Sequence, residues 1–326
     1  MPHRTLLCLL ALAPILAMQP AGAAPPASVY PAKAVTIVVP YAAGGATDAM
    51  IRPIAEALSI QWKQPVIVDN RPGANGIIAT QLVSKAAPDG YTLLLNLTGI
   101  VQNLSLYKKV PYDPFKDLQA ITQLGTQPMG LAVSPAGPYR TVGALLDAAR
   151  ATPGKFSYGS FGTGSTGHIY GELLRSTAKL EIPHVAYKGE APMLPDLIAG
   201  RVQLGFVSAS TAATRHRDKS LRILAVTGPR RIGTMADVPT LAELGYKGFE
   251  AVGWYGLFAP AGTPRPVVDK IAADARAVVQ SPAIVARLRD QAIDPTGTSP
   301  DDFTRLLRAD YAKWDGLIKT FKIELE

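Results

Sequence analysis

Short apolar runs alternate along this chain with segments whose apolar residues recur at helical spacing. The run VTIVV at 35–39 is apolar at every position, which is typical of a parallel strand that is buried on both faces. After it, apolar residues recur every three to four positions from Ile51 to Leu58, which predicts an amphipathic helix. Two more strand-like runs, at 66–70 and 92–96, flank a second helical pattern. The pattern therefore predicts a β-α-β-α-β unit.

A second series of the same kind begins near residue 131. Its strand-like runs are LAVSP, FSYGS, HVAYKG, LGFVS and LRILAVTG, with helical patterns between the first four. GWYGLFAP at 253–260 reads as a long strand, and the remainder of the chain reads as helices. We expect two α/β lobes, with the helical tail returning to the first. Extended, glycine-containing segments near 125–131 and 251–258 are the expected crossings between the lobes.

The first residues have the pattern of an export signal. Arg4 precedes an apolar stretch from Leu6 to Met18, and AGA at 21–23 fits the small-residue cleavage rule. The stretch is too short to span a bilayer. We expect a signal peptide at 1–23 and a periplasmic mature protein that is not embedded in the membrane; an uncleaved anchor is the alternative. The only cysteine, Cys8, lies in this segment, so the mature chain would have no disulfide, thiolate zinc site or cysteine nucleophile.

Composition and charge narrow the possible partners. The chain is 48% hydrophobic and 18% charged, which indicates a globular protein, and 326 residues usually divide into two domains. A formal net charge of +8 favours anionic ligands. The basic patches at 215–219 and 228–233 are short and contain no aromatic residues. We therefore expect no nucleic-acid binding.

Two glycine-rich loops each join a strand to a helix. GTGSTG at 162–167 is one, and PYAAGGATDAM at 40–50 is the other. Gly44 and Gly45 would permit a positive φ and close approach of the backbone to a ligand. Thr47 or Asp48 could cap the helix after the first loop, as Ser165 or Thr166 could after the second.

Each of these loops would present backbone N–H groups at a helix N-terminus, which is an anion-binding arrangement. In open α/β sheets, ligands lie beyond the carboxyl ends of the strands. If the two lobes face each other, one loop from each would meet across a cleft. A small molecule with carboxylates suits such a cleft.

Three catalytic or cofactor interpretations are weaker. GTGSTG matches the GxGxxG fingerprint, but the next strand ends in Tyr187-Lys188-Gly189, without the acid that binds a ribose, so we expect no dinucleotide and no other cofactor. Ser165 and His168 could pair as in a hydrolase, yet the chain has no GxSxG elbow around Ser165. His168 and Glu172 are spaced to share a metal, but a zinc site needs three or four ligands. We expect neither an enzyme nor a metal protein.

The motifs together resemble the Bug family, the extracytoplasmic substrate-binding components of tripartite tricarboxylate transporters. In order, the chain carries YPAKAVTIVVPYAAGGATD, DNRPGANGIIATQLVSKAAPDGYTLLL, YGSFGTGSTGHIYGELL, HVAYKGEAPMLPDLIAGRVQLGFVS, LRILAVTGPRRIGTMADVPTLAELGY and GWYGLFAPAGTP. The resemblance covers essentially the whole mature chain. It implies a type II periplasmic-binding-protein fold: two α/β lobes, joined by two crossing strands, that close on a ligand in the cleft between them.

On this resemblance, lobe 1 would comprise 29–127 and 252–326, and lobe 2 would comprise 128–251. The family grips a ligand carboxylate with the two glycine loops, largely through backbone and ordered water. Carried over to this chain, and with a pocket wall added, the ligand-binding residues would be Tyr41, Gly44, Gly45, Ala46, Thr47, Asp48, Thr98, Ser160, Gly162, Gly164, Ser165, Thr166, His168, Tyr187, Lys188 and Ser208.

The resemblance implies a monomeric binding protein for a small carboxylate, such as a dicarboxylate, a tricarboxylate, an acidic amino acid or a related acid or amide. Its partners would be the membrane permease subunits of a tripartite transporter; a membrane sensor kinase is the alternative. Two segments depart from the family pattern, at 96–100 and at Ser208-Ala209-Ser210, and both leave the identity of the ligand open.

Overall fold

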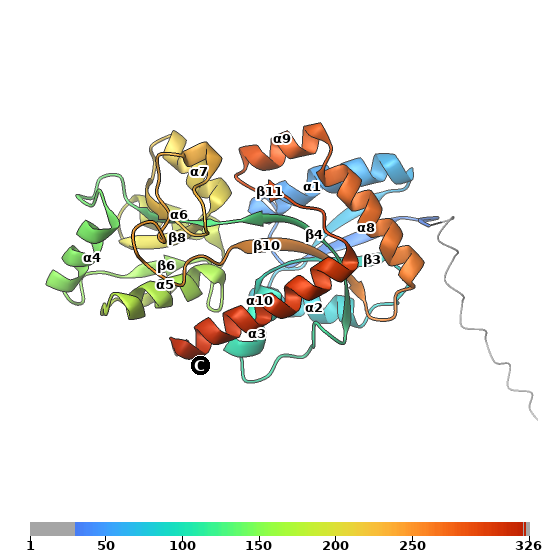
Figure 1. Ribbon diagram of the computed structural model, residues 1–326, viewed down its shortest axis with the longest axis horizontal. Helices are drawn as coiled ribbons and strands as arrows, with labels where there is room; N and C mark the ends of the chain where they lie inside the picture. Colours follow the sequence, from blue (N-terminus) through green and yellow to red (C-terminus); the bar gives the residue numbers. More distant parts are fainter. Residues whose placement is uncertain (1–29, 322, 324–326) are drawn as a thin grey trace, which may run out of the picture.

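The structure, a computed structural model, describes residues 30–321 and 323, so the signal peptide expected at 1–23 lies outside the described residues. The strands form two separate sheets, and Figure 1 shows them side by side along the long axis of the molecule. No helix within 30–321 is long and apolar enough to cross a membrane. The molecule is thus a two-sheet α/β protein, as the alternating pattern predicts.

The first sheet has six strands in the order β11-β4-β10-β3-β1-β2. β1 pairs in parallel with β2 and β3, whereas β10 runs antiparallel to β3 and β4. Its strands are β1 (Val35–Val39), β2 (Val66–Asn70), β3 (Thr92–Leu97), β4 (Leu118–Gln127), β10 (Gly253–Pro260) and β11 (Asp294–Pro295). Its helices are α1 (Ala46–Trp62), the 3₁₀ turn η1 (Ala74–Gly76), α2 (Ile77–Ser84), α3 (Gly99–Leu106), α8 (Arg265–Val279), α9 (Pro282–Asp290) and α10 (Pro300–Thr320).

The second sheet has five strands in the order β7-β6-β8-β5-β9. β6 is parallel to β7 and β8, and β5 is antiparallel to β8 and β9. Its strands are β5 (Met129–Val133), β6 (Tyr158–Ser160), β7 (His184–Ala186), β8 (Leu204–Ser208) and β9 (Arg222–Val226). Its helices are α4 (Val142–Ala151), α5 (Thr166–Thr177), α6 (Glu190–Ile198), α7 (Ala209–Arg217) and the 3₁₀ turn η2 (Gly233–Met235).

Two segments cross between the sheets, as predicted. β4 of the first sheet continues through Pro128 into β5 of the second, and the chain returns from Phe249 into β10. β4 and β10 pair along their whole lengths, from Gly253 opposite Gln127 to Pro260 opposite Leu118. The two crossings therefore leave the first sheet next to each other.

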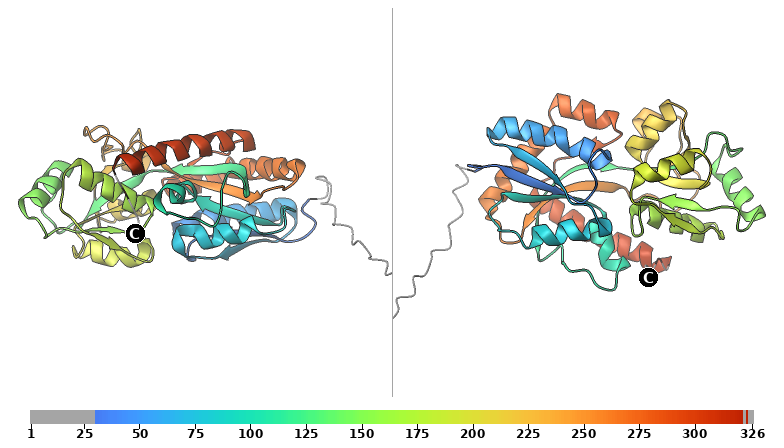
Figure 2. Two further views of the ribbon diagram at one scale, coloured as in Figure 1. Left: turned by 90° about the horizontal axis from the view of Figure 1, so that it is seen from below. Right: turned by 180° about the vertical axis from the view of Figure 1, so that it is seen from behind.

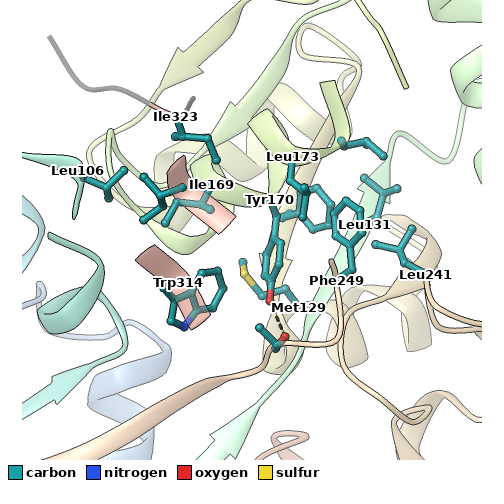
Figure 3. Packing of buried hydrophobic residues seen from close by; sticks show 14 of the residues in the cluster. Leu106, Met129, Leu131, Ile169, Tyr170, Leu173, Leu241, Phe249, Trp314 and Ile323 are labelled. Atoms are coloured by element: carbon teal, nitrogen blue, oxygen red, sulfur yellow. Dashed lines mark hydrogen bonds between the residues drawn. The ribbon is translucent and has the colours of Figure 1, made fainter. Parts of the chain in front are cut away.

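Helix α10 contacts both parts of the molecule. Its buried residues Phe303, Leu307, Trp314 and Ile318 recur at the helical spacing that the sequence predicts. Its first half covers the first sheet, but Trp314 meets Tyr170 of α5 edge to face, with ring centroids 5.6 Å apart. Figure 3 shows this packing, with the Tyr170 hydroxyl bonded to the Ala251 carbonyl, and Figure 2 shows α10 running from one sheet toward the other. The tail therefore returns to the first lobe and also contacts the second.

Several elements were not predicted. The strand β4 reads LQAITQLGTQ, and its polar residues break the apolar pattern by which a buried strand is recognised in a sequence. Two of these polar residues, Thr122 and Gln123, are nevertheless buried. The 296–298 segment bonds to the Thr122 side chain and to the Gln123 backbone: the Thr122 hydroxyl donates to the Thr298 carbonyl, and the Gln123 backbone N–H donates to Thr298 Oγ1. Helices α3 and α7 were likewise not predicted, and α3 begins inside the segment at 96–100 that departs from the family pattern.

Candidate functional site

The first loop, residues 40–45, leads from β1 into α1. Gly44 has φ +82° and so needs the left-handed conformation that glycine supplies. Gly45 has φ −83° and ψ 178°, which any residue adopts, so the prediction of a positive φ is confirmed for Gly44 and wrong for Gly45. Residues 42–45 are exposed. The loop therefore presents its backbone to solvent just before the start of a helix of 17 residues.

Neither Thr47 nor Asp48 caps α1, contrary to prediction, because the N-cap residue is Gly45 and no side chain bonds the first turn. Asp48 instead reaches back to accept a hydrogen bond from the Gly44 N–H at 3.0 Å. Arg52 and Asn70 also donate to its carboxylate, at 2.6 and 3.1 Å. Burial alone would raise the pKa of Asp48, but these hydrogen bonds lower it overall. Asp48 thus braces the loop, with its charge neutralised by Arg52.

The missing cap leaves donors available at the start of α1. The N–H groups of Ala46, Thr47 and Asp48 precede the first intrahelical hydrogen bond, which runs from the Ala49 N–H to the Gly45 carbonyl. No acceptor within residues 30–321 contacts these three donors. A helix start with unpaired N–H groups and its positive dipole end favours an anion.

The second loop, residues 161–165, leads from β6 into α5. Gly162 and Gly164 have φ +143° and +78°. Their N–H groups are already used inside the loop, because Gly162 donates to Ser160 Oγ at 3.2 Å and Gly164 donates to His168 Nδ1 at 3.2 Å. Ser165 caps α5 as predicted, accepting from the His168 N–H at 3.3 Å.

The donors that remain at this helix start are those of Thr166 and Gly167, for which the described part of the chain offers no acceptor. The predicted glycines therefore shape the second loop, while the residues that follow them carry its free N–H groups.

Two stacked histidines hydrogen-bond to residues at the second loop. The rings of His168 and His184 stack with centroids 4.0 Å apart, and Tyr158 stacks on His184 at 4.9 Å. His184 Nε2 lies 2.7 Å from Ser160 Oγ. Burial, together with the neighbouring His168, lowers the pKa of His184 to about 4, and burial also lowers the pKa of His168. Both rings are therefore neutral at pH 7, which lets His168 Nδ1 accept the Gly164 N–H.

Side chains from η1 and α3, which belong to the first-sheet half of the molecule, contact the second loop directly. Asn75 Nδ2, in η1, donates to the Gly164 carbonyl at 2.9 Å, and the Thr166 hydroxyl donates to Gln102 Oε1 of α3 at 3.2 Å. Gln102 Nε2 is buried and has no acceptor within the described chain. Gly76, next to Asn75, lies so close to Pro40 that a Cβ on it would be 3.2 Å from the proline Cβ. The η1 turn thus borders both glycine loops, which places them near each other.

The sequence did not single out Asn75, Gln102 or His184. Asn75 has φ +48° in the motif PGANG, and an asparagine directly before a glycine is a signal of such a turn. Gln102 and His184 carry no local signal, because their roles depend on contacts with residues 64 and 24 positions away.

The remaining predicted site residues lie in varied surroundings. The Tyr41 side chain is partly buried, and burial raises its pKa to about 12. Thr98 is buried and accepts from the Trp254 N–H at 3.0 Å, so it holds the second crossing. The Tyr187 hydroxyl donates to Asp196 at 2.7 Å. Lys188 is exposed. Ser208 caps α7 and donates to Glu190.

Ser165 and His168, the residues considered for a hydrolase, make separate hydrogen bonds in this structure. Ser165 Oγ accepts from the backbone N–H of His168, and the His168 Nδ1 atom accepts from Gly164. The Ser165 hydroxyl and the His168 imidazole form no hydrogen bond with each other. Glu172, the other residue considered for a metal, binds Tyr158 and Arg175 instead. Within residues 30–321 and 323, no three His, Cys, Asp or Glu side chains cluster as metal ligands.

The sequence of the chain matches the family model "Tripartite tricarboxylate transporter family receptor" over residues 50–323. It is 38% identical over 295 residues to a protein of the tcbD-tcbE intergenic region of Pseudomonas sp. strain P51, covering 90% of this chain and 88% of the relative. It is 33% identical over 303 residues to the protein BugT of Bordetella pertussis, covering 92% and 93% of the two chains.

Solved structures share the fold. The R. palustris protein Rpa4515, solved with adipate, superposes with a TM-score of 0.87 at 36% identity and covers 91% of this chain and 100% of its own. MatC from Rhodopseudomonas palustris, solved with bound malate, gives a TM-score of 0.83 at 28% identity, covering 89% and 100%. The periplasmic binding protein BugD gives 0.85 at 31% identity, covering 91% and 100%.

Proposed function

The chain belongs to the receptor family of the tripartite tricarboxylate transporters, to which the Bug proteins also belong, and on this premise we propose that it is a periplasmic solute-binding protein for a small carboxylate. The observation that carries the proposal is the pair of helix starts with unpaired N–H groups, α1 on the first sheet and α5 on the second. The η1 turn lies next to both loops, with Asn75 bonded to Gly164 and Gly76 beside Pro40. The ligand would lie between the two helix starts.

The donors suffice for a useful affinity. A hydrogen bond to a charged group contributes about 1.5–3 kcal/mol, and micromolar binding needs about 8 kcal/mol. About four to six such hydrogen bonds are needed to reach this level after the costs of ordering. The N–H groups of Ala46, Thr47, Asp48, Thr166 and Gly167 and the buried Gln102 amide supply that number of donors. No lysine or arginine has to contact the ligand.

The ligand class is a dicarboxylate, a tricarboxylate, an acidic amino acid or a related acid or amide. Two relatives were solved with adipate and with malate. These are small dicarboxylates, so each could place one carboxylate against the helix starts. We propose that this chain holds its ligand in the same way.

The proposal includes the arrangement in the cell. A signal peptide at 1–23 would direct export. Lobe 1, residues 29–127 with 252–326, and lobe 2, residues 128–251, would move about the two crossings. The protein would act as a monomer and deliver its ligand to permease subunits in the membrane or to a sensor kinase. Affinity capture from membranes with the liganded and ligand-free protein would distinguish these partners.

A thermal-shift screen tests the proposed function. Mono-, di- and tricarboxylates, amino acids and their amides are each added to the purified mature chain. Selective binding of the folded state raises the melting temperature by mass action, by an amount that grows with ligand concentration. We expect at least one carboxylate to act at micromolar concentration, and its methyl ester to act more weakly. A protein that none of these compounds stabilises would contradict the proposal.

A further inference from the structure

Two buried polar atoms lie without partners where the crossing strands leave the first sheet. Gln127 ends β4, and Tyr255 is near the start of β10. Gln127 pairs with Gly253 and Gly125 pairs with Tyr255, so the two side chains are on one face of the paired strands. The Gln127 Oε1 and Tyr255 Oη atoms are buried and form no hydrogen bond within the described residues, although the Gln127 amide lies close enough to Tyr255 to lower the pKa of its hydroxyl. Gln127 is 9% exposed and Tyr255 is 0% exposed.

A carboxylate without a counter-ion lies near these atoms. Glu190 is the first residue of α6, and its Oε1 accepts from the Ser208 N–H at 2.9 Å and from the Ser208 hydroxyl at 3.2 Å. Burial raises the pKa of Glu190, and its hydrogen bonds from Ser208 and Thr211 offset only part of this effect. No basic side chain of residues 30–321 forms an ion pair with it. Glu190 is therefore a half-buried acid held by neutral donors alone.

These three groups lie in the region that the glycine loops border. Ser208 ends β8, which pairs in parallel with β6, so Ser208 and the second loop leave the same edge of the second sheet. Burial raises the pKa of Tyr255 most, and the charges of Glu190 and of Tyr41 in the first loop raise it further. Met129, two residues after Gln127, pairs with Ser208, and Ser208 binds Glu190, so Glu190 lies beside the crossing strands. The charge effects on the pKa of Tyr255 agree with this placement and put Tyr41 near it as well.

The chemistry of this group is opposite to that of the helix starts. The helix starts and Gln102 Nε2 offer donors, whereas Gln127 Oε1 and the Glu190 carboxylate only accept, and Tyr255 Oη can accept. Buried acceptors without a donor are unfavourable, so a donor supplied by the ligand would satisfy them. An unsubstituted, fully ionised dicarboxylate has no such donor, so it would leave these acceptors unpaired.

We propose that Glu190, Gln127 and Tyr255 form an acceptor group that recognises a hydroxyl or ammonium on the ligand, so that this chain selects hydroxy acids or amino acids over unsubstituted acids of the same carbon frame. The inference rests on the proposed function, because the carboxylate end of the ligand is held by the helix starts. The formal charge of Glu190 favours an ammonium, while Gln127 and Tyr255 also suit a hydroxyl.

Matched ligand sets test the inference. Calorimetric titration compares aspartate, malate and succinate, which share a four-carbon frame, and phenylalanine, phenyllactate and 3-phenylpropionate, which share an aromatic one. In the frame that binds, we expect the substituted acid to bind at least tenfold more tightly than the unsubstituted one. E190Q keeps an oxygen to accept from Ser208, so it should fold, and it should weaken the amino acid more than the hydroxy acid.

Y255F provides a second variant that separates binding from stability. Because the Tyr255 hydroxyl has no partner in the described chain, its removal should leave the melting temperature of the unliganded protein unchanged or raised. It should nevertheless weaken binding of the substituted acid about fivefold or more, which is the effect of losing one hydrogen bond. Its affinity for the unsubstituted acid should stay within about threefold of wild type.

The outcomes distinguish the two proposals. If carboxylates bind but the substituted and unsubstituted acids bind equally, or if E190Q and Y255F weaken all acids alike, the acceptor group is wrong and the carboxylate-binding function stands. If neither frame binds, and the carboxylates that do stabilise the protein carry no hydroxyl or ammonium, the acceptor group is again wrong. If no carboxylate of any kind binds, both proposals are wrong.

Discussion

Replacing Ala46 with proline removes one donor from the proposed carboxylate site with little other change. Ala46 is the first residue of α1, a position where proline is common because its N–H makes no intrahelical bond. The preceding Gly45 has ψ 178°, which suits a residue before proline. The Ala46 N–H has no acceptor within the described residues. We therefore expect the unliganded protein to keep or slightly raise its melting temperature.

The expected loss of affinity follows from one hydrogen bond to a charged oxygen. At about 1.5–3 kcal/mol, its removal weakens binding about 10- to 150-fold. The assay is calorimetric titration of the acid that stabilises the wild type most, at fixed pH and salt. Ala46→Val is the matched control, because it adds comparable bulk and keeps the N–H; it should bind within about threefold of wild type if bulk alone matters little.

Two results would refute this reasoning. Unchanged affinity in Ala46→Pro would mean that the start of α1 does not hold the ligand. Equal losses in Ala46→Pro and Ala46→Val would mean that steric exclusion, and not the missing donor, causes the effect. Lys188→Ala adds a contrast: this exposed side chain should be replaceable within about threefold, and a loss above tenfold would favour a charge pair over backbone capture.

Three further predictions concern the supports of the site. The pKa of His184 is lowered to about 4 in the folded state, against about 6.5 when unfolded, so unfolding takes up a proton between these pH values. The melting temperature should therefore fall as the pH drops from about 6.5 to 4, and His184→Phe should flatten this part of the profile. An unchanged profile in the variant would contradict the neutral histidine stack. Gly171→Ala would place a Cβ 2.1 Å from the buried Tyr158 ring, and chemical denaturation should show a loss of about 1–3 kcal/mol, whereas wild-type stability would mean that the ring is free to move. Gly44→Ala should lower the free energy of unfolding by about 1–2 kcal/mol because Gly44 has a positive φ, whereas Gly45→Ala should change it little. Equal losses in the same denaturation experiment would argue against the assigned loop conformation.

Elements with a simple burial pattern were predictable from sequence. The strands at 35–39, 66–70, 204–208 and 253–260 have the predicted bounds. The runs at 35–39, 204–208 and 253–260 form strands buried on both faces, whereas the strand at 66–70 is a partly exposed edge strand. β4 was not predicted, since its buried polar residues are satisfied by a segment about 175 residues away along the chain. Local patterns carry no information about such partners.

The same limit applies to the site. The two strand–glycine–helix connections and the Ser165 cap were visible in the sequence, because each depends on neighbours along the chain. The sequence could not show that the N–H groups of Gly162 and Gly164 turn to Ser160 and His168, which leaves the donor role to the residues that follow. Nor could it show that Asn75 reaches the second loop, because that contact depends on how the two sheets are placed.

The most direct test is a crystal structure of the mature protein with a bound acid. The account predicts a carboxylate group of the ligand between the starts of α1 and α5, with its oxygens about 2.7–3.2 Å from N–H groups of residues 46–48 and 166–167. A ligand held by lysine or arginine side chains, or bound away from both helix starts, would contradict it.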